Sequence, residues 1–379
     1  MQDARRVGLV LAAIFAAGAV STAYLPLWFT DQGLTPGQIG LVLGLASVLR
    51  VVGVPGGGWL ADRIGRRSVL VAAAGLAAAA ALALPSLHGV AALLPATVVL
   101  GVCASLLSPL MDAVTLALAR AGRLDYGPTR AWGSVAYMLA TAGAGALLAR
   151  SGSGVVPVLL LIGYAAAAVS AVRVPDVPTP RMTGDTLIAA EGPFRSPGFR
   201  WALLATVLIQ GSHAAYYGFA TLHWRAAGIG DTTIGLLIAE GILAEVALFL
   251  WGKRLIERLG PPGLTACAAA ACLLRWTVTG LTVEVAALAA VQLLHAVTFA
   301  FQHLSTMLVL GRLPPQRAAM AQALMSAIGF SLATGVLVWA TGQAYGTWHG
   351  LVFLPMAAVG GLALLTVAPL SRTAAGSRR

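Results

Sequence analysis

The stretch that decides the fold is Gly58-Trp-Leu-Ala-Asp62-Arg63-Ile-Gly65-Arg66-Arg67, a charged decapeptide between two long apolar stretches. Two membrane-spanning helices that form a hairpin must turn within a few residues, and glycines let their backbones approach closely. The three arginines of the decapeptide favour the side of the bilayer with the anionic leaflet. The segment therefore predicts a helical hairpin whose turn faces the cytoplasm.

The composition excludes a soluble protein. Hydrophobic residues make up 59% of the 379 residues and charged residues only 10%, and the mean hydropathy is +0.86. That apolar surface exceeds what one soluble core can bury, so we expect an integral membrane protein. Cys103, Cys267 and Cys272 lie inside apolar stretches without metal-ligand spacing, so the sequence predicts neither a disulfide framework nor a zinc site.

The chain contains twelve apolar stretches that are long enough to cross about 30 Å of hydrocarbon as helices. The first follows Arg5 and Arg6 and could be a signal peptide, but similar stretches follow it, so we interpret it as a helix. The predicted spans are 7–29, 38–60, 68–87, 91–117, 130–149, 155–172, 200–222, 233–251, 263–281, 285–310, 318–341 and 347–369.

The basic residues indicate the topology. Of the 24 lysines and arginines, 20 lie at the N-terminus, in alternate loops and in the C-terminal tail, whereas the opposite loops hold only Arg150 and Arg225. This bias predicts a multi-pass protein of the bacterial cytoplasmic (inner) membrane with both termini in the cytoplasm. It also accounts for the net charge of +11, so no nucleic-acid partner is expected.

A proline-rich connection divides the predicted helices six and six. We expect an N-terminal six-helix bundle over 1–172, a cytoplasmic linker over 173–199 and a C-terminal six-helix bundle over 200–379. Gly252-Lys-Arg-Leu-Ile-Glu-Arg-Leu-Gly260 is a weaker copy of the first charged turn at the matching place in the second half. Two related halves of this kind are typical of secondary transporters, which bind their cargo near the bilayer midplane.

Charged residues inside the predicted spans are functional candidates, because each costs roughly 2.5 to 3.5 kcal/mol to insert. The alternative for each is an ion pair that only holds two helices together. Asp112 and Arg130, on neighbouring spans, can pair or can bind a ligand jointly. The five charged residues are Arg50, Asp112, Glu240, Glu245 and Arg275.

Three of the predicted spans bring together the chemistry of proton coupling. Glu245 and His295 both lie about 16 to 18 Å from the outer ends of their helices, and the long side chain of Arg275 can reach the same level. A carboxylate in apolar surroundings holds a proton at neutral pH and releases it when an arginine approaches. Glu240 lies about 140° around the helix from Glu245, so the two cannot serve one site equally.

Polar side chains form stripes at helical spacing, and we expect these stripes to line a cavity. Single members can instead bond a neighbouring helix. Arg130 suits a carboxylate, and the indole of Trp132 suits an aromatic ring. The stripes comprise Gln292, His295, Phe299 and Gln302 with His303; Gln210, His213, Tyr217 and Thr221; Ser105, Ser108, Asp112 and Thr115; and Ser21, Tyr24 and Trp28.

The charged turn Gly-x-x-x-Asp-Arg-x-Gly-Arg-Arg resembles the signature of the major facilitator superfamily. The resemblance implies an all-α integral membrane protein with twelve transmembrane helices in two pseudo-symmetric six-helix bundles. Further segments resemble the phenylpropionate permease family, in which Arg50 and Asp112 have counterparts and Glu240 matches no position. These segments are Leu-Asp-Tyr-Gly-Pro-Thr-Arg-Ala-Trp-Gly-Ser at 124–134, Gln-Gly-Ser-His-Ala-Ala-Tyr-Tyr-Gly-Phe at 210–219, Ala-Glu-Val at 244–246, Arg-Trp at 275–276, and the run from Val291 to Leu304.

The set Glu245, Arg275 and His295 is also similar in arrangement to the coupling residues of the lactose permease group. Asp112 and Arg130 are similar to the sugar contacts of that group. The resemblance implies proton symport but not a sugar as cargo.

These observations together predict a transporter, not an enzyme, that imports a small organic solute such as an aromatic carboxylate by proton symport and alternating access. We expect no cofactor and no metal, a proton gradient as driving force, a small-molecule substrate and the lipid bilayer as partners, and a monomer. Proton coupling is assigned to Glu245, Arg275 and His295. Substrate binding is assigned to Tyr24, Arg50, Asp112, Arg130, Trp132, His213, Tyr217, Gln292 and His303. Conformational gating is assigned to Gly58, Asp62, Arg63, Gly65, Arg66 and Arg67.

Other hypotheses remain open at this point. A drug efflux antiporter fits the intact turn, although 136–147 lacks the proline of an antiporter signature. A sugar or nucleoside symporter is a second alternative. A sensor or enzyme partner would need a soluble domain or a catalytic constellation, and no phosphate-binding loop for ATP is visible. His295 and His303 are about two helical turns apart, too far to share a metal. The substrate, the direction, proton against sodium coupling, the role of Glu240 and the oligomeric state stay open.

Overall fold

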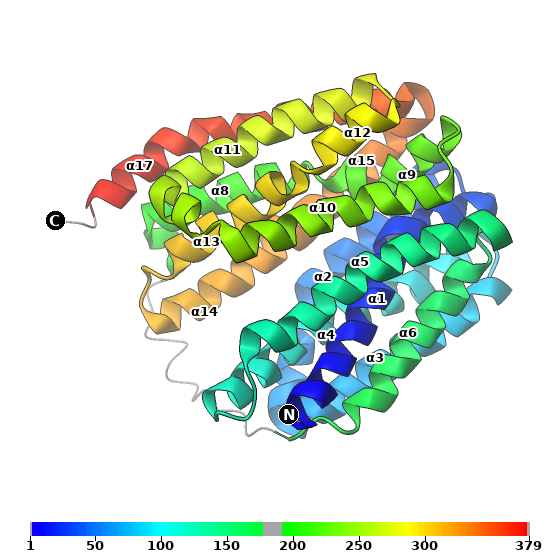
Figure 1. The fold of residues 1–379 in the computed structure, drawn as a ribbon, viewed down its shortest axis with the longest axis horizontal. Helices are drawn as coiled ribbons and strands as arrows, with labels where there is room; N and C mark the ends of the chain where they lie inside the picture. Colours follow the sequence, from blue (N-terminus) through cyan, green and yellow to red (C-terminus); the bar gives the residue numbers. More distant parts are fainter. Residues whose placement is uncertain (1, 177–191, 377–379) are drawn as a thin grey trace. The chain divides into compact units, whose positions relative to one another are not determined.

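The computed structural model describes residues 2–176 and 192–376, and over these ranges its regular structure consists of helices without a strand (Figure 1). Residue contacts divide the chain into two compact units. Unit 1 comprises Met1–Arg181 and Thr221–Ala239, and unit 2 comprises Met182–Ala220 and Glu240–Arg379. Much of the expected linker, 177–191, lies outside the described residues. The expected domain limits therefore stay a prediction.

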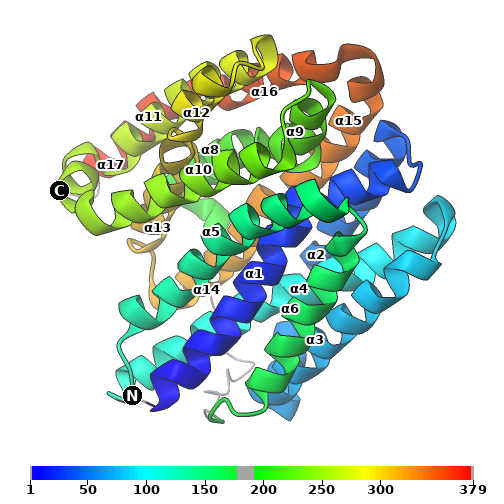
Figure 2. The same ribbon diagram turned by 45° about the vertical axis from the view of Figure 1, so that its right-hand side comes forward.

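Unit 1 is built from six long helices, and α1 packs against α5 and α6 (Figure 2). The apolar residues Val7, Leu11, Ile14 and Ala17 of α1 recur every three or four positions, and all of them are buried. Helix α2 packs on α4, and α3 packs on both α4 and α6. The helices are α1 (Gln2–Asp31), α2 (Pro36–Ile64), α3 (Arg66–Ala83) with the short η1 (Leu84–Ser86), α4 (Gly89–Arg120), α5 (Tyr126–Ser151) and α6 (Val155–Ala171).

The charged turn does form a helical hairpin, but it is tighter than expected. Helix α2 continues to Ile64 and α3 begins at Arg66, so a single residue, Gly65, separates them. Gly65 has φ 94°, a conformation that is open to glycine and strained for other residues. On the side facing α4, a side chain at Gly53 or Gly57 would overlap Val102 or Leu106 respectively, which explains the close packing of α2 and α4.

The end of α9 and the start of α10 group with unit 1 and contain a cluster of charges. Arg225 donates to both carboxylate oxygens of Asp231, at 2.8 and 2.7 Å, and lies 3.3 Å from Asp31. Ser153 also donates to Asp31. Next to this cluster, a side chain on Gly235 would come within 2.7 Å of the carbonyl oxygen of Thr141. The backbones of α10 and α5 therefore touch here.

Unit 2 is organised around α11, which packs against α16 and α13, and around α8, which packs against η4, α13 and α16. Gly260, with φ 58°, and the two prolines that follow it kink α11 near its start. The elements are η2 (Pro193–Arg195), α8 (Pro197–Gly211), α9 (Ala214–Ala226), α10 (Asp231–Trp251), α11 (Lys253–Leu281), α12 (Val285–Gln292), η3 (Ala296–Phe301), α13 (Gln302–Leu310), α14 (Pro315–Leu324), η4 (Met325–Leu332), α15 (Ala333–Trp348), η5 (His349–Val352), α16 (Phe353–Leu362), η6 (Ala363–Thr366) and α17 (Val367–Gly376), where α9 and α10 are shared between the units.

Several predicted spans in the second half are not continuous α-helices. The span 200–222 breaks at Ser212 and His213, and 285–310 breaks after Gln292 and continues through the π-helix η3. A second π-helix, η4, interrupts 318–341. Hydropathy could not predict these breaks, because the residues on both sides are equally apolar. π-Helical turns inside α-helices often mark functional sites.

By length and apolar composition, nine helical runs within the described residues could cross a membrane. The last of these runs, Met320–Thr373, contains both of the final predicted spans. Helix α6, with 17 residues, is shorter than these nine runs, and the break between α8 and α9 divides the predicted span 200–222. The count of twelve therefore stays a prediction.

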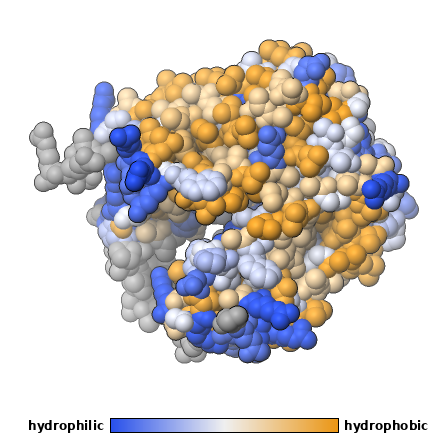
Figure 3. Space-filling view, in the orientation of Figure 1, coloured by the Kyte–Doolittle hydropathy of each residue, from blue (hydrophilic) through white to orange (hydrophobic). Residues whose placement is uncertain are grey.

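The surface fits a multi-pass membrane protein. Leu82, Leu250 and Leu365 are 64%, 66% and 71% exposed, and apolar side chains cover much of the face seen in Figure 3. Leucines exposed to this degree over many helices are stable in lipid and costly in water.

Candidate functional site

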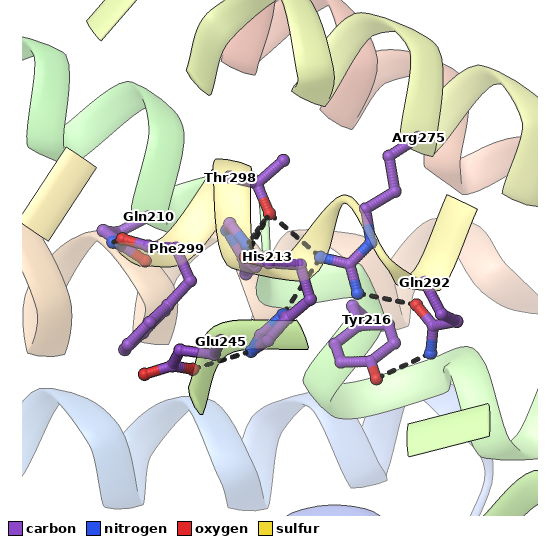
Figure 4. A network of polar contacts seen from close by, with 9 residues as sticks. Gln210, His213, Tyr216, Glu245, Arg275, Gln292, Thr298 and Phe299 are labelled. Carbon is purple, nitrogen blue, oxygen red and sulfur yellow. Dashed lines mark hydrogen bonds and ion pairs between the residues drawn. The ribbon is translucent and has the colours of Figure 1, made fainter. Parts of the chain in front are cut away.

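Arg275 of α11 lies at the centre of a buried polar cluster in unit 2 (Figure 4). Its Nη2 donates to Gln292 Oε1 at 2.7 Å, and its Nη1 donates to Thr298 Oγ1 at 3.1 Å and to His295 Nδ1 at 3.2 Å. Gln292, His295 and Thr298 follow at intervals of three residues across the break between α12 and η3, which turns all three towards α11. We call Arg275 and its surroundings the Arg275 cluster, which comprises His213, Tyr216, Glu245, Arg275, Gln292, His295 and Thr298.

Two aromatic rings flank the guanidinium of Arg275. Its Cζ lies 4.4 Å from the ring centroid of Trp276 and 4.6 Å from that of Tyr216. Gln292 Nε2 donates to the Tyr216 hydroxyl at 2.9 Å, so Gln292 uses both ends of its amide within the cluster. Trp276 Nε1 donates to Ser212 Oγ at 2.9 Å. Cation–π contacts and charge-assisted hydrogen bonds of this kind stabilise a buried arginine.

The hydrogen bond from Arg275 determines which nitrogen of His295 carries the proton. A guanidinium can only donate, so His295 Nδ1 must accept, and in the neutral ring the hydrogen is on Nε2. Nε2 lies 3.7 Å from Glu245 Oε2 of α10. This separation is longer than a hydrogen bond, but a shift of less than 1 Å would close it. The predicted convergence of Glu245, Arg275 and His295 is therefore present in unit 2.

Gly241 lets α10 come this close. A side chain at position 241 would lie 3.1 Å from His295 Cβ and 3.3 Å from the carbonyl oxygen of Gln292, tighter than ordinary contact. Glu245 is one helical turn further along the same face of α10. The glycine thus positions the Glu245 carboxylate beside the imidazole.

A second chain of hydrogen bonds leads from Arg275 to the break between α8 and α9. His213 Nδ1 lies 2.9 Å from the carbonyl oxygen of Ile209, which only accepts, so Nδ1 is the donor. Nε2 of neutral His213 therefore accepts from the Thr298 hydroxyl, 3.1 Å away, and the carbonyl oxygen of His295, at 3.3 Å, is a second acceptor for the same hydroxyl hydrogen. From donor to acceptor, the hydrogen bonds run from Arg275 to Thr298, from Thr298 to His213, and from His213 to Ile209. Both nitrogens of His213 are used in this chain, so the structure gives His213 a positioning role within the cluster.

Tyr217 and His303 lie beside this cluster. Tyr217 stacks on His213 with ring centroids 5.9 Å apart, and it is less buried than Tyr216. His303, on α13, is half-buried. Their expected roles in ligand binding stay predictions.

Unit 1 contains the other predicted substrate residues. Arg130 Nε donates to Asp112 Oδ1 at 3.0 Å, so these residues form the expected ion pair. The guanidinium of Arg130 also lies 4.2 Å from the Phe15 ring. Trp132 is 46% exposed, and its ring packs over Gly8, where a side chain would overlap the indole.

Tyr24 and Arg50 differ in their hydrogen bonding. Tyr24 is fully buried, and its hydroxyl donates to the carbonyl oxygen of Thr141 at 2.7 Å, a contact that holds α1 to α5. Arg50 lies in the middle of α2, and its buried Nε has no hydrogen-bond partner within the described residues. An unpaired buried donor on a charged group is rare and costs about 1 to 3 kcal/mol or more.

The expected gating residues all lie at the tight hairpin. Arg63 places its guanidinium 3.8 Å from the ring centroid of Trp59. Asp62, Arg63 and Arg67 are exposed, and Gly58 and Gly65 belong to the end of α2 and the turn itself. The hairpin is therefore present as expected, and its gating role stays a prediction.

Sequence reasoning missed Tyr216 and Thr298, which complete the Arg275 cluster. The available signal was their spacing, because Tyr216 follows His213 by three residues and Thr298 follows His295 by three. It also missed the pair of Arg225 and Asp231. There the signal was the rarity of arginine in the predicted outer loops.

Comparisons with known proteins agree with this architecture. The model of the MFS_1 like family matches residues 6–354. The chain is 30% identical over 373 residues to the "Probable 3-phenylpropionic acid transporter" of Escherichia coli strain K12, covering 95% of this chain and 96% of that protein. It is 26% identical over 366 residues to the maltose permease of Geobacillus stearothermophilus, covering 95% of this chain and 93% of that permease.

Solved structures show the same fold. The nucleoside transporter NupG superimposes with a TM-score of 0.77 at 16% identity, over 98% of this chain and 99% of that chain. The xylose transporter XylE from E. coli gives a TM-score of 0.64 at 15% identity, over 96% and 94% of the two chains. Together with the helical hairpin at Gly65 and the match along most of the chain, these likenesses identify the chain as a member of the MFS_1-like family of major facilitator transporters, of the phenylpropionate permease type.

Proposed function

We propose that this transporter is a proton-coupled symporter that imports a small organic carboxylate with an aromatic ring, by alternating access. The observation that carries the proposal is the contact of His295 with both Arg275 Nη1 and Glu245 Oε2, at 3.2 and 3.7 Å. The name of the E. coli relative supports the class of cargo.

Glu245 is the proton carrier in this proposal. As a carboxylate it attracts the Nε2–H of His295, and protonation on one oxygen removes the charge and weakens that attraction. His295 is less suited to carry the proton, because a hydrogen on Nδ1 would face the N–H of Arg275, donor against donor. Protonation of Glu245 would thus change how α10 is held to the Arg275 cluster, and this change is the coupling step.

Uptake into proteoliposomes tests the proposal. Labelled 3-phenylpropionate should accumulate when the outside is more acidic than the inside. Glu245→Gln should lose accumulation driven by the gradient while still exchanging label across equilibrated membranes, because the amide cannot take up the proton. Glu240→Gln is the matched control, because Glu240 lies on the same helix as Glu245, about 140° around the helix axis from it. Accumulation by Glu245→Gln at the wild-type level would contradict the assignment.

A sugar or a nucleoside is the second candidate cargo. The maltose permease aligns over 95% of this chain, and the NupG fold is similar along the whole length. Maltose and uridine therefore belong in the uptake assay, together with a sodium gradient in place of the proton gradient. Accumulation of either one, with none of the carboxylate, would replace the proposed cargo. Extrusion of the carboxylate or of cationic drugs against an inward proton gradient would indicate an antiporter.

We also propose that the chain is a monomer in the bacterial inner membrane with both termini in the cytoplasm. The distribution of its lysines and arginines supports this orientation. A thiol reagent that does not cross membranes should label Ser151→Cys, at the end of α5, from outside intact cells. The same reagent should leave Ser68→Cys, beside the charged turn, unlabelled. The reverse pattern would invert the topology.

A further inference from the structure

Arg50 is a cation in the middle of a helix long and apolar enough to span a membrane, and it has no partner among the described residues. It lies 14 residues from either end of α2, Pro36–Ile64, which places it about 21 Å along the helix from both ends. Among the described residues it forms no hydrogen bond or ion pair, and its Nε is buried without an acceptor. A charge at this depth is expected to bind something.

Three other arginines, in contrast, have hydrogen-bond or ion-pair partners. Arg130 is paired with Asp112 at 3.0 Å, and Arg275 donates to three side chains of its cluster. Arg225 uses both Asp31 and Asp231. Of these four arginines, Arg50 is therefore the one that forms no hydrogen bond or ion pair within the described residues, so its N–H groups can bind an external anion.

Within the described residues, the groups around Arg50 are uncharged, and a glycine faces its guanidinium. Across from it on α4 is Gly101, where an added side chain would come 3.6 Å from Nη2 and 3.9 Å from Nε, and 3.3 Å from Ala46 Cβ. In the part of the chain that the structure describes, Tyr164 on α6 interacts electrostatically with Arg50, and no carboxylate does. A cation in such apolar surroundings attracts an anion much more strongly than it would in water.

We propose that Arg50 is the binding site for the carboxylate group of the transported solute, held through two parallel N–H···O bonds from the guanidinium. This inference rests on the proposed function and makes it more specific. It assigns the anion to Arg50 and not to Arg130, whose Nε already donates to Asp112. It also restricts the cargo to monoanions with a planar acid group, because a guanidinium matches the two oxygens of a carboxylate.

Binding of an acid and of its neutral analogue to the purified full-length protein tests this assignment. The probes are 3-phenylpropionate and 3-phenylpropanamide, which have nearly the same shape and differ in charge. The wild type should bind the acid at least about tenfold more tightly than the amide. Arg50→Gln should lose about ten- to hundredfold in affinity for the acid and little for the amide, so the preference disappears.

Two further variants keep the test decisive. Gly101→Leu retains the charge but places a large side chain against the guanidinium, so it should also weaken binding of the acid. Arg50→Lys should retain part of the affinity, because an ammonium attracts the anion without the bidentate geometry. Arg150→Gln, an exposed arginine at the predicted outer surface, is the control for net charge and should bind the acid like the wild type. Thermal unfolding of each variant separates loss of binding from loss of the fold.

The outcomes distinguish this proposal from the proposed function. If Arg50→Gln folds and still prefers the acid, or if Gly101→Leu binds it like the wild type, Arg50 is not the carboxylate site. If a neutral solute is accumulated through Glu245 while the acid is not bound, the Arg50 assignment fails and proton coupling stands. If the wild type binds the acid through Arg50 but never accumulates it under a proton gradient, only the proposed symport fails.

Discussion

The hydroxyl of Thr298 should make a measurable contribution to the stability of unit 2. Thr298→Val removes this hydroxyl and keeps the shape of the side chain. In the structure the hydroxyl accepts from Arg275 Nη1 at 3.1 Å and donates to His213 Nε2 at 3.1 Å, with the carbonyl oxygen of His295 as a more distant second acceptor at 3.3 Å. The variant therefore leaves one buried acceptor on His213 without a donor and takes one of three acceptors from Arg275.

The magnitude follows from these two losses. Leaving a buried acceptor unsatisfied costs about 1 to 3 kcal/mol, and a hydrogen bond to a charged group contributes about 1.5 to 3 kcal/mol. Arg275 keeps His295 Nδ1 as an acceptor for the same Nη1, so the second loss is only partial. We expect Thr298→Val to lower the free energy of unfolding by about 2 to 4 kcal/mol. Thr298→Ser retains the hydroxyl and should lose about 1 kcal/mol, from the missing methyl group.

Equilibrium unfolding in mixed detergent micelles, followed by tryptophan fluorescence, measures these differences. Combining Thr298→Val with His213→Phe in a double-mutant cycle isolates the interaction between the two residues, which should couple by about 1 kcal/mol or more. If Thr298→Val unfolds within about 0.5 kcal/mol of the wild type, or if the two variants are additive, the hydrogen-bond order from Arg275 to His213 is wrong.

Three further predictions follow from other parts of the structure. Gly241→Val should push α10 away from His295. Gradient-driven uptake should fall at least tenfold, while exchange at equilibrium stays largely intact. Equal loss of both rates would argue against a role of this contact in coupling. Arg225→Gln should lower the free energy of unfolding by about 1 kcal/mol, because its contacts with Asp231 are lost. In the same unfolding assay, the control Arg150→Gln should change this free energy by less than about 0.5 kcal/mol. If one proton accompanies one carboxylate anion, the complex that moves carries no added charge, so a pH gradient should drive uptake and a potassium diffusion potential alone should not; uptake that responds to the potential would require a different stoichiometry.

The helical hairpin and the approach of Glu245, Arg275 and His295 could be predicted from the sequence because each depends on local rules. The tight turn needs a glycine, and arginines show the side of the membrane. Depth along regular helices, at about 1.5 Å per residue, placed the carboxylate and the imidazole at the same level. No tertiary information was needed to expect that these groups meet.

The parts that could not be predicted depend on packing between helices that are distant in sequence. Hydropathy does not distinguish the π-helix at 296–301 from an α-helix, yet this element brings Thr298 to Arg275. Polar spacing selected Tyr217, whereas Tyr216, one residue earlier, is the ring that lies against the guanidinium. One residue shifts a side chain by about 100° around a helix, so the choice depends on which face meets α11.

Arg275 and Arg50 differ in the number of partners around their guanidinium groups. This difference bears on which residues handle the proton and which bind the cargo. Nη1 and Nη2 of Arg275 have three hydrogen-bond acceptors and two aromatic rings lie beside its guanidinium, although its Nε, like that of Arg50, is buried without a partner within the described residues. Arg50 has none of these partners within the described residues, so a bound anion would supply what the protein omits. Through Nη1, Arg275 orients His295 towards Glu245 in this structure, whereas the Arg50 guanidinium, which lacks such partners, would gain the most from a bound anion. Proton handling in unit 2 and anion binding in unit 1 then require different residues, and substitutions at Arg50 and at Glu245 should therefore affect binding and coupling independently.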